Sequence, residues 1–508
     1  MVASASAPAP EHVLALDCGT TSVRAIAFDR AGREAASARR EFAQHFPHPG
    51  WVEHDATEIW EATLACAREA VATLRNARGL GPRCIAAIGI TNQRETVVVW
   101  ERATGRPIHR AIVWQDRRTS ARLAELRTQG HEPSVRAATG LTLDPYFSAS
   151  KLAWILDAVA GARARAERGE LAAGTIDSWI AWNLTAGRAH LTDASNASRT
   201  LLARIGGPAG AAWDDALCGL FGVPREVLPR IVDSSGIVAA TDPAVLGFEA
   251  PIAGIAGDQQ AALFGQACHG TGDAKCTFGT GCFLLANAGD AAPAPPEGLL
   301  ATVAWRIGGK TAYAVEGSVF VGGSAVQWLR DGLRIIAKAP DVNVLAAEVA
   351  DSGGVVVVPA FAGLGAPWWD ADARGAILGL TRGSTRAHVA RATLEGIAHQ
   401  VADLVEAIRA GGTPIAELRV DGGAAASDLL MQVQADLSGI PVGRPKDLET
   451  TALGAAELAR RAVDGAVASR PPAFERRFEP RLDERTRGDV RMRWRRAVDI
   501  VRSFGSHA

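Results

Sequence analysis

The chain has 508 residues, 54 basic and 55 acidic side chains, and a formal net charge of −1. At roughly 150 residues per domain, this length predicts two to four domains, and it suffices to bury large cores without disulfides or metals. Proteins that bind nucleic acids or lie on membrane surfaces usually carry a basic excess, so the balanced charge argues against both classes. The 53 glycines predict many tight turns or close approaches of the backbone to a ligand.

The cysteines and the apolar segments both indicate a cytoplasmic protein without membrane insertion. The seven cysteines are scattered and no pair has CxxC spacing, which predicts free thiols in a reducing compartment. Residues 1–11 lack the pattern of a signal peptide and are expected to form a disordered tail. The longest apolar stretch, residues 355–369, is broken by prolines and glycines and is too short to span a bilayer.

In the first half of the chain, short apolar runs alternate with helical patterns, which predicts an α/β fold. Residues 13–17 and 22–28 predict a hairpin around the turn Cys18-Gly19-Thr20-Thr21. A helix is expected at residues 57–74, with Asp55 and Glu58 forming a capping box at its start. Further strands are expected at residues 84–91 and 97–100, and a helix at residues 148–159.

The second half repeats the theme of a hairpin closed by a Gly/Thr turn. A strand at residues 251–257 ends at Asp258, and strands at 275–278 and 282–286 flank the turn Gly279-Thr280-Gly281. Later elements are expected as a strand at 355–358, a helix at 387–410, a strand at 418–421, a helix at 427–437 capped by Ser427, and a helix at 485–502 with Trp494, Val498 and Val501 facing inward. The repetition predicts two similar lobes with a seam near residue 265, joined by packed crossings because no linker separates them.

Three turns have the composition of phosphate-binding segments. In Asp17-Cys18-Gly19-Thr20-Thr21, the glycine allows close backbone approach, the amides and hydroxyls donate to phosphate oxygens, and the carboxylate holds hydrated Mg²⁺. The turns Gly279-Thr280-Gly281 and Asp421-Gly422-Gly423 are similar candidates. Ordinary hairpin and strand–helix turns remain the alternative for each. The P-loop, protein-kinase and dinucleotide fingerprints are absent from the sequence.

Asp258 is the best candidate for a general base, because it ends an apolar strand where ligands of α/β sheets bind. The alternative is a helix N-cap. Arg94 and Glu95, at another strand end, offer donors and an acceptor suited to vicinal hydroxyls. Trp114 and Tyr146 would add an aromatic wall for the C–H face of a polyol, although each alone suits a core aromatic as well.

The chemistry-bearing stretches recur together over nearly the whole chain. They are Asp17–Thr21, 50–55, 89–96, 111–115, 144–148, 254–265, 278–283, 359–368, 379–399 and 421–423. In this combination the sequence resembles the FGGY family of carbohydrate kinases. The Arg94-Glu95 pair with Trp114 and Tyr146 is similar to the members that act on glycerol rather than on xylulose or gluconate.

The resemblance implies a two-lobed actin/hexokinase-like fold in which each lobe is a ribonuclease H-like mixed sheet flanked by helices. The N-terminal lobe, residues 12–265, would hold the glycerol site and the first phosphate turn. The C-terminal lobe, residues 266–508, would hold the second phosphate turn and the adenosine site. The implied activity is ATP-dependent phosphorylation of glycerol to sn-glycerol 3-phosphate, with Mg²⁺ as cofactor, in a homodimer or homotetramer.

The family pattern also implies roles for individual residues. The glycerol contacts would be Arg94, Glu95, Trp114, Tyr146, Asp258, Gln259 and Phe283. The nucleotide contacts would be Thr20, Thr21, Ser22, Arg24, Thr280, Gly323, Gln327, Gly423 and Ser427. Asp258 would be the base and a further candidate Mg²⁺ ligand, and Asp17 would hold Mg²⁺ through water.

Two departures from the family pattern bear on regulation. Cys18 stands where the family usually has glutamine, and a thiol beside the phosphates predicts activity that is sensitive to oxidation. Residues 244–251 lack the Gly-rich, Arg-containing loop that binds fructose 1,6-bisphosphate in enteric members. Two other functions stay open: a kinase for another polyol or ketose, and a catalytically silent sugar-sensing regulator, which would usually carry a DNA-binding domain or lack Asp258.

Overall fold

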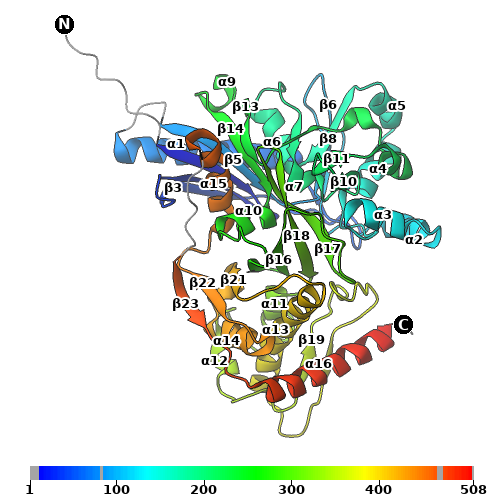
Figure 1. Ribbon diagram of the computed structural model, residues 1–508, viewed down its shortest axis with the longest axis vertical. Coiled ribbons are helices and arrows are strands. Elements are labelled where there is room, and N and C mark those ends of the chain that lie inside the picture. Colours follow the sequence, from blue (N-terminus) through cyan, green and yellow to red (C-terminus); the bar gives the residue numbers. More distant parts are fainter. Residues whose placement is uncertain (1–10, 80–83, 466–472, 506–508) are drawn as a thin grey trace.

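The computed structural model describes residues 11–79, 84–465 and 473–505, so the expected tail at residues 1–11 lies outside the described part except for Glu11. One 13-stranded mixed sheet runs through both lobes (Figure 1). Its strands, in spatial order, are β23 (Phe474–Phe478), β22 (Val442–Pro445), β21 (Leu418–Asp421), β15 (Ala274–Phe278), β16 (Cys282–Gly289), β18 (Lys310–Val319), β17 (Leu300–Ile307), β13 (Ser235–Ala240), β14 (Pro251–Gly257), β5 (Ile85–Asn92), β1 (His12–Cys18), β2 (Ser22–Phe28) and β3 (Glu34–Glu41).

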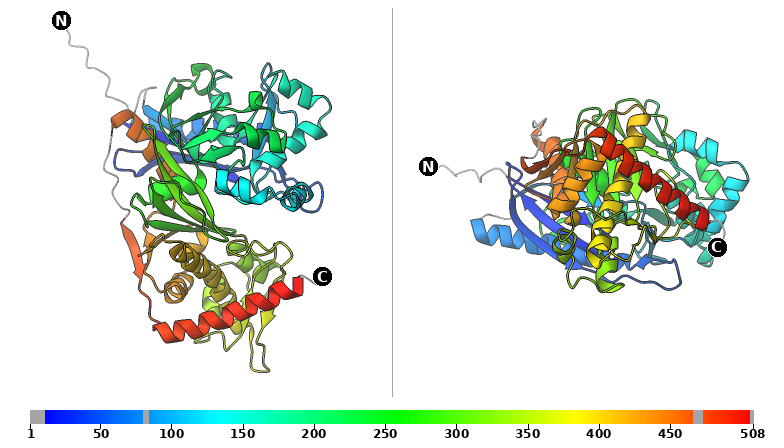
Figure 2. Two further views of the ribbon diagram at one scale, coloured as in Figure 1. Left: turned by 45° about the vertical axis from the view of Figure 1, so that its right-hand side comes forward. Right: turned by 90° about the horizontal axis from the view of Figure 1, so that it is seen from below.

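The two halves of this sheet repeat one topology. In the first half the order is β3-β2-β1-β5-β14, and in the second it is β18-β16-β15-β21-β22. In both, the first three strands are antiparallel and the last two join in parallel. Figure 2 shows the two lobes one above the other, with the green strands between them. The predicted two-lobed α/β class, with a ribonuclease H-like sheet in each lobe, is confirmed.

Two helices, one from each lobe, pack against strands of the opposite lobe. Helix α10 (Asp258–Gly265) follows β14 of the first lobe and contacts β14 and β5, but it also packs against β15, β16 and β17 of the second lobe. Helix α15 (Thr450–Asp464) follows β22 of the second lobe, yet it packs on β1, β5, β14 and β13, as Figure 1 shows. The two helices also pack on each other. The lobes are therefore joined by the sheet and by this crossing. Packed crossings were predicted because the sequence has no linker-like segment at the seam.

The crossing is close because glycines face each other there. A Cβ built on Gly454 would lie 1.8 Å from the carbonyl oxygen of Ala261, and one on Gly265 would lie 2.2 Å from the carbonyl oxygen of Thr450. Both obstacles are backbone atoms, so no side-chain rotation relieves them. Because α10 begins at Asp258, the position of that carboxylate depends on the crossing.

A single added methyl group at the crossing is expected to lower stability. Gly454→Ala should reduce the free energy of unfolding by about 1–3 kcal/mol, as overpacking does in other cores. Chemical denaturation measures it. The matched control is Gly488→Ala, in a helix where nothing lies within 4 Å of the new Cβ; it should raise stability by about 0.5–1 kcal/mol. Equal changes in the free energy of unfolding for the two substitutions would contradict the close packing of α10 on α15.

Both faces of the central strand β1 are buried. Leu14 and Leu16 of β1 belong to a core cluster with helix α1 (Ala56–Arg78), and the alternate residues Val13 and Ala15 belong to a cluster with α15. The side chain of Asp55 caps α1 by accepting hydrogen bonds from two backbone amides, as predicted. The capping box is wrong, however, because the Glu58 carboxylate accepts a hydrogen bond from the amide of Ala43 instead (3.1 Å).

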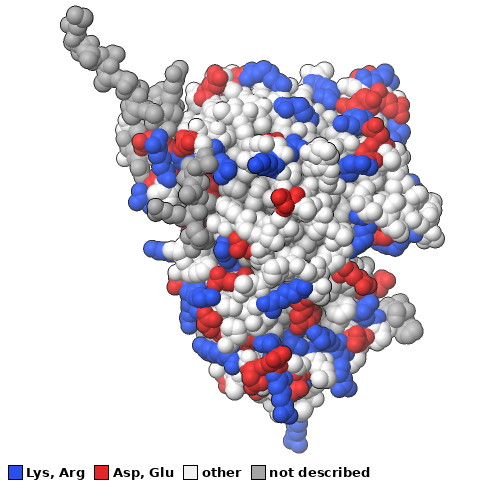
Figure 3. All heavy atoms as spheres, in the orientation of Figure 1, with Lys and Arg blue, Asp and Glu red and all other residues white. Residues whose placement is uncertain are grey.

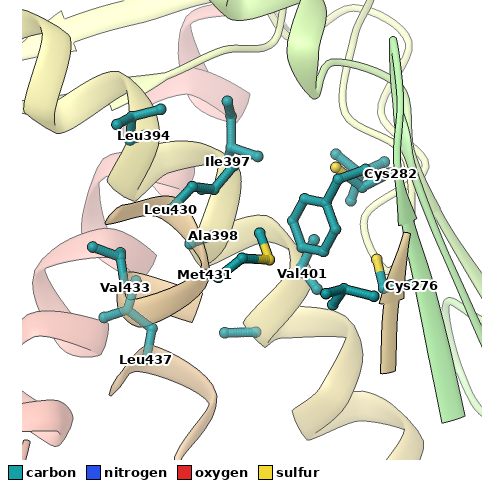
Figure 4. Close-up of a cluster of buried hydrophobic side chains, with 14 of the residues drawn as sticks. Cys276, Cys282, Leu394, Ile397, Ala398, Val401, Leu430, Met431, Val433 and Leu437 are labelled. Carbon is teal, nitrogen blue, oxygen red and sulfur yellow. The ribbon is translucent and has the colours of Figure 1, made fainter. Parts of the chain in front are cut away.

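The second-lobe core lies between the sheet and the helices α13 (Arg386–Ala410) and α14 (Asp428–Ser438). Figure 4 shows Ile397 and Val401 of α13 meeting Met431 of α14 beside the strand cysteines Cys276 and Cys282. Helix α16 (Glu484–Gly505) closes the lower end in Figure 1. Its Trp494, Val498 and Val501 are buried as predicted.

The remaining elements elaborate the lobes. In the first lobe they are β4 (Glu53–His54), β6 (Val97–Glu101), β7 (Ala111–Ile112), β8 (Leu171–Thr175), α2 (Ser120–Thr128), α3 (Glu132–Thr139), α4 (Ser148–Ala158), α5 (Ala162–Glu167), α6 (Ile176–Leu184), β9 (Leu191–Asp193), α7 (Ala194–Ala197), β10 (Ala203–Ile205), β11 (Ala211–Trp213), α8 (Asp215–Phe221), β12 (Arg230–Val232) and α9 (Pro243–Leu246). In the second they are α11 (Gly323–Asp331), α12 (Asp341–Ala346), β19 (Val356–Val358) and β20 (Ala376–Leu378).

The surface and the cysteines agree with the composition. All seven cysteines are buried and free, as predicted. On the face shown in Figure 3, acidic and basic side chains are interspersed without a large patch of one sign. None of the helices within residues 11–79, 84–465 and 473–505 is long and apolar enough to cross a membrane.

Candidate active site

Three glycine-containing turns meet where the strands of the two lobes end. Between β1 and β2, the amide of Gly19 donates to the carbonyl of Ser22 (3.0 Å). Between β15 and β16, the carbonyls of Gly279 and Thr280 accept hydrogen bonds from the amides of Gly323 and Gly322, each 2.8 Å long, at the start of α11. The third turn follows β21, which lies parallel to β15 in the sheet.

The first two turns face one cavity of about 200 Å³. It is lined by Thr20, Arg94, Glu95, Trp114, Tyr146, Asp258, Gln259, Thr277, Gly279, Thr280, Gly281 and Phe283. These residues come from both lobes, so the cavity lies between them. All seven residues expected to contact glycerol line it, together with Thr20 and Thr280 of the two phosphate turns.

Arg94 is the most connected side chain of the cavity. Its guanidinium donates to the Tyr146 hydroxyl (3.1 Å), and its Nε lies 3.4 Å from the carboxylate of Asp258. Glu95 has a φ of 59°, in the left-handed region that non-glycine residues rarely adopt. Such strain collects at functional sites, where surrounding contacts hold it; here the Glu95 carboxylate accepts a hydrogen bond from Arg199 (2.7 Å).

The aromatic wall is built as expected. Trp114 stands edge-on to Tyr146 and to Phe283, with ring centroids 5.6 and 5.9 Å apart. Its indole Nε1 also donates to the Thr20 hydroxyl (3.0 Å), so the wall is tied to the first phosphate turn. The arrangement combines charged donors, a carboxylate and aromatic faces, which suits a small polyol.

Comparison with known families identifies the fold and its two halves. The N-terminal domain of the FGGY family of carbohydrate kinases matches residues 12–265, and the C-terminal domain of that family matches residues 274–463. This chain belongs to the FGGY family of carbohydrate kinases.

Relatives with known names include several from bacteria. The glycerol kinase of Aromatoleum aromaticum is 57% identical over 499 residues, covering 97% of this FGGY kinase and 99% of that relative. The glycerol kinase of Deinococcus radiodurans is 54% identical, covering 97% and 98%. Among solved structures, the Plasmodium falciparum glycerol kinase with ADP matches with a TM-score of 0.89 at 33% identity, covering 96% and 98% of the two chains. A Brucella ovis xyloylose kinase matches with a TM-score of 0.84 at 25% identity, covering 98% and 100%.

Beneath the residues of this FGGY kinase that are expected to contact a polyol lies a buried ion network that the sequence analysis missed. Glu316 of β18 accepts two hydrogen bonds from Arg94 (2.6 and 2.9 Å) and one from Arg199 (3.0 Å). Burial alone would raise the pKa of Glu316, but the charges of Arg199 and Arg94 lower it to about 2. Glu316 belongs to the second lobe, so the network also joins the lobes.

Two carboxylates of the site, those of Asp17 and Asp258, have raised pKa values. Burial raises the pKa of Asp17 to about 6; Arg24 opposes the rise, and the nearby charge of Asp258 adds to it. Burial also raises the pKa of Asp258, against the charges of Arg94 and Lys275. Within the described residues, no group of three or more His, Cys, Asp or Glu side chains forms a metal cage. Two carboxylates beside the candidate phosphate turns fit Mg²⁺, which takes one or two carboxylates together with substrate phosphates.

The residues at and after the first turn that are expected to contact the nucleotide differ in exposure and in their partners. Ser22 closes the turn with its backbone carbonyl, and Thr21 is exposed beside it. Arg24 lies 3.4 Å from Asp17 and pairs with Glu449, just before α15. Thus the first turn is tied to a residue of the second lobe.

The candidates of the second lobe gather around α11. A Cβ on Gly323 would lie 3.9 Å from the Cβ of Ala424, next to Gly423, and a Cβ on Gly423 would meet nothing within 4 Å. Gln327 lies one turn further along α11. The Ser427 hydroxyl is engaged as the predicted cap of α14, accepting from the amide of Leu430 (3.1 Å) and donating to Asn343.

The expected sensitivity of Cys18 to oxidation is not supported by its position. Its side chain is fully buried and its thiol contacts the hydroxyl of Thr63 in α1, 3.6 Å away, rather than the turn. Burial raises the pKa of the thiol to about 12. Because the thiolate is the reactive form, burial and the raised pKa disfavour oxidation of Cys18.

Removing the indole N–H of Trp114 is expected to affect nucleotide use more than polyol binding. Trp114→Phe keeps an aromatic wall but frees the Thr20 hydroxyl, and loss of one hydrogen bond of about 0.5–1.5 kcal/mol corresponds to about a two- to tenfold lower kcat/KM for Mg·ATP. Steady-state kinetics with each substrate varied measures this. Trp154→Phe, outside the cavity, is the control. A change confined to the KM for the polyol would refute the coupling.

Proposed function

We propose that this FGGY kinase transfers the γ-phosphoryl group of ATP to glycerol, giving sn-glycerol 3-phosphate and ADP. The observation that carries the proposal is one cavity that brings a candidate base, a charged pair for hydroxyls, an aromatic wall and two phosphate turns together. The glycerol site belongs to the proposed lobe of residues 12–265, and the adenosine site to the proposed lobe of residues 266–508.

The chain's own residues supply binding, orientation and proton transfer. Glu95 accepts and Arg94 donates hydrogen bonds to neighbouring hydroxyls, and Trp114 covers the C–H face. Asp258 accepts the proton of a terminal hydroxyl as its oxygen attacks the γ-phosphorus, which needs an ionised carboxylate within hydrogen-bond reach. The amides and hydroxyls of the turns around Thr20 and Thr280 bind the phosphates. Closing of the lobes excludes water and limits wasteful hydrolysis of ATP.

Magnesium is the proposed cofactor. When bound, Mg²⁺ neutralises phosphate charge that develops during transfer. Asp17 would hold it through water, and the facing carboxylate of Asp258 is a further candidate ligand.

Removal of the Asp17 carboxylate should chiefly impair the use of Mg·ATP. Asp17→Ala is expected to lower kcat/KM for Mg·ATP by about 10²-fold, because metal stabilisation of phosphate charge is worth several kcal/mol, and to leave the KM for glycerol nearly unchanged. Rates measured over a range of Mg²⁺ concentrations test this. An Asp17→Ala protein with the metal dependence of the parent would refute the role of Asp17.

A coupled ADP-release assay tests the activity itself. We expect glycerol to stimulate ADP release far more than dihydroxyacetone, erythritol or xylulose. Preference for another polyol or ketose would make the protein a sibling kinase of the same family. No stimulation by any of them, with retained polyol binding, would favour a catalytically silent sensor. The presence of Asp258 in the cavity speaks against that last function.

We also propose a cytoplasmic enzyme that assembles as a homodimer or homotetramer. The cytoplasm is supported by seven cysteines that stay free. The assembly follows from the family resemblance, and light scattering of the purified protein measures it.

A further inference from the structure

Lys275 is a fully buried cation on β15, four residues before the turn at Gly279. A buried ammonium group requires partners, because its unpaired charge would be costly. Its Nζ donates to the amide oxygen of Gln259 and to the hydroxyl of Thr277 (2.8 Å). The mechanism proposed above assigns this lysine no task, although both of its partners line the polyol cavity.

The chemistry of the ammonium group fixes the orientation of the Gln259 amide. A lysine Nζ only donates hydrogen bonds, so the atom of Gln259 that faces it must be Oε1. The Nε2 group then points to the other side. The Gln259 side chain lines the cavity together with Asp258, so its N–H groups are left to face that cavity.

The reverse orientation of this amide is strongly disfavoured. If the amide turned over, its oxygen would face the cavity, and its N–H groups would face the lysine, which accepts none. The buried lysine would then keep only the hydroxyl of Thr277 as a hydrogen-bond acceptor. The charged groups around Lys275 are Asp421, Asp258 and Arg94. The hydrogen bond described here is nevertheless accepted by the side-chain oxygen of Gln259 and not by one of these groups.

We propose that Lys275 is a positioning residue for the polyol: it holds the amide oxygen of Gln259 so that the amide N–H groups face the cavity and a substrate hydroxyl. This inference rests on the proposed phosphorylation of glycerol and adds a residue that no direct contact with substrate would reveal. Since Lys275 belongs to the second lobe and Gln259 to α10, the orientation depends on the seating of α10 against β15.

The test is a double-mutant cycle on kcat/KM for glycerol, with the full-length protein. Lys275→Met should lower kcat/KM by about 10–100-fold, by analogy with the loss of a residue that orients a metal-binding side chain. Gln259→Ala should cause a similar loss. The double variant should lose no more than the worse single variant, because both remove one interaction. Additive losses would overturn the proposal, since a merely structural lysine acts independently of Gln259.

Two further variants separate orientation from stability. Lys275→Arg, which also only donates, should retain more kcat/KM than Lys275→Met; equal losses would count against the proposal. If Lys275→Met does not fold, Gln259→Glu decides: its carboxylate accepts from Lys275 but presents no N–H group, so it should lose as much activity as Gln259→Ala. A Gln259→Glu protein as active as the parent would overturn the proposal.

The same assays distinguish a failure of this inference from a failure of the proposed function. Lys310→Met, at an exposed lysine of β18, should match the parent in every measurement. If the parent itself does not phosphorylate glycerol, the proposed function fails. The cycle is then measured with whichever polyol stimulates ADP release, where non-additive losses would still support the positioning role and additive ones would refute it.

Discussion

Replacing Asp258 with asparagine is expected to lower the turnover number with glycerol by about 10²–10⁴-fold or more while the chain stays folded. Asparagine has nearly the same shape as aspartate. Its side-chain oxygen still accepts the hydrogen bond that the backbone N–H of Gln259 donates to the carboxylate (2.8 Å). It cannot accept the proton of the attacking hydroxyl. The KM for glycerol should change little, because Arg94, Glu95 and the aromatic wall remain.

Three measurements make this result decisive. Steady-state ADP release gives the turnover number, thermal unfolding shows that the variant is folded, and ADP binding shows that the nucleotide site is intact. Asp242→Asn is the matched control: it makes the same change at an aspartate that caps the short helix α9, and its turnover should equal that of the parent. Near-normal turnover of a folded Asp258→Asn protein would remove Asp258 from the role of base.

The sequence predicted the cavity well because its residues stand at strand ends. Asp258, the Arg94-Glu95 pair and the two Gly/Thr turns each follow an apolar run, and the ends of neighbouring strands meet at one edge of a sheet. The hairpin repeat likewise predicted two lobes of one topology. Placement of α15 on the first lobe could not be read from the sequence, because chain order does not say which sheet an amphipathic helix covers.

Two of the residues that the sequence analysis missed are charges buried inside apolar strands. Glu316 lies in a strand of mostly apolar residues, and Lys275 lies beside Cys276 in another. A lone charge in such a strand is itself a signal, since buried charges need partners. The partner could not be named in advance, because Arg94 and Glu316 are more than two hundred positions apart and only the folded sheet brings them together.

Neutralising Glu316 is expected to cost both stability and glycerol recognition. Glu316→Gln would leave the buried Arg94 with the carboxylates of Asp258 and Glu95, and the buried Arg199 with that of Glu95. Removing one member of a buried ion network costs about 3–5 kcal/mol, because the other charges stay desolvated. Arg94 would then be drawn towards the Asp258 and Glu95 carboxylates, which it already approaches to 3.4 and 3.7 Å.

Two readouts separate these effects. Denaturant unfolding should show the loss of stability, and kcat/KM for glycerol should fall about tenfold or more, equivalent to about 1.4 kcal/mol or more. Glu125→Gln, which breaks an exposed pair with Arg122, is the control and should change stability by less than about 1 kcal/mol.

The pH dependence gives the Glu316 network a signature of its own. The folded-state pKa of Glu316, about 2, lies below the ordinary glutamate value of 4.5. Its stabilisation is therefore fully present above pH 4.5 and is lost as pH falls towards 2. The difference in unfolding free energy between the parent and Glu316→Gln should be constant near neutral pH and should shrink in that acidic window. A difference that does not depend on pH would mean that Glu316 stabilises the fold by its shape and not by its charge.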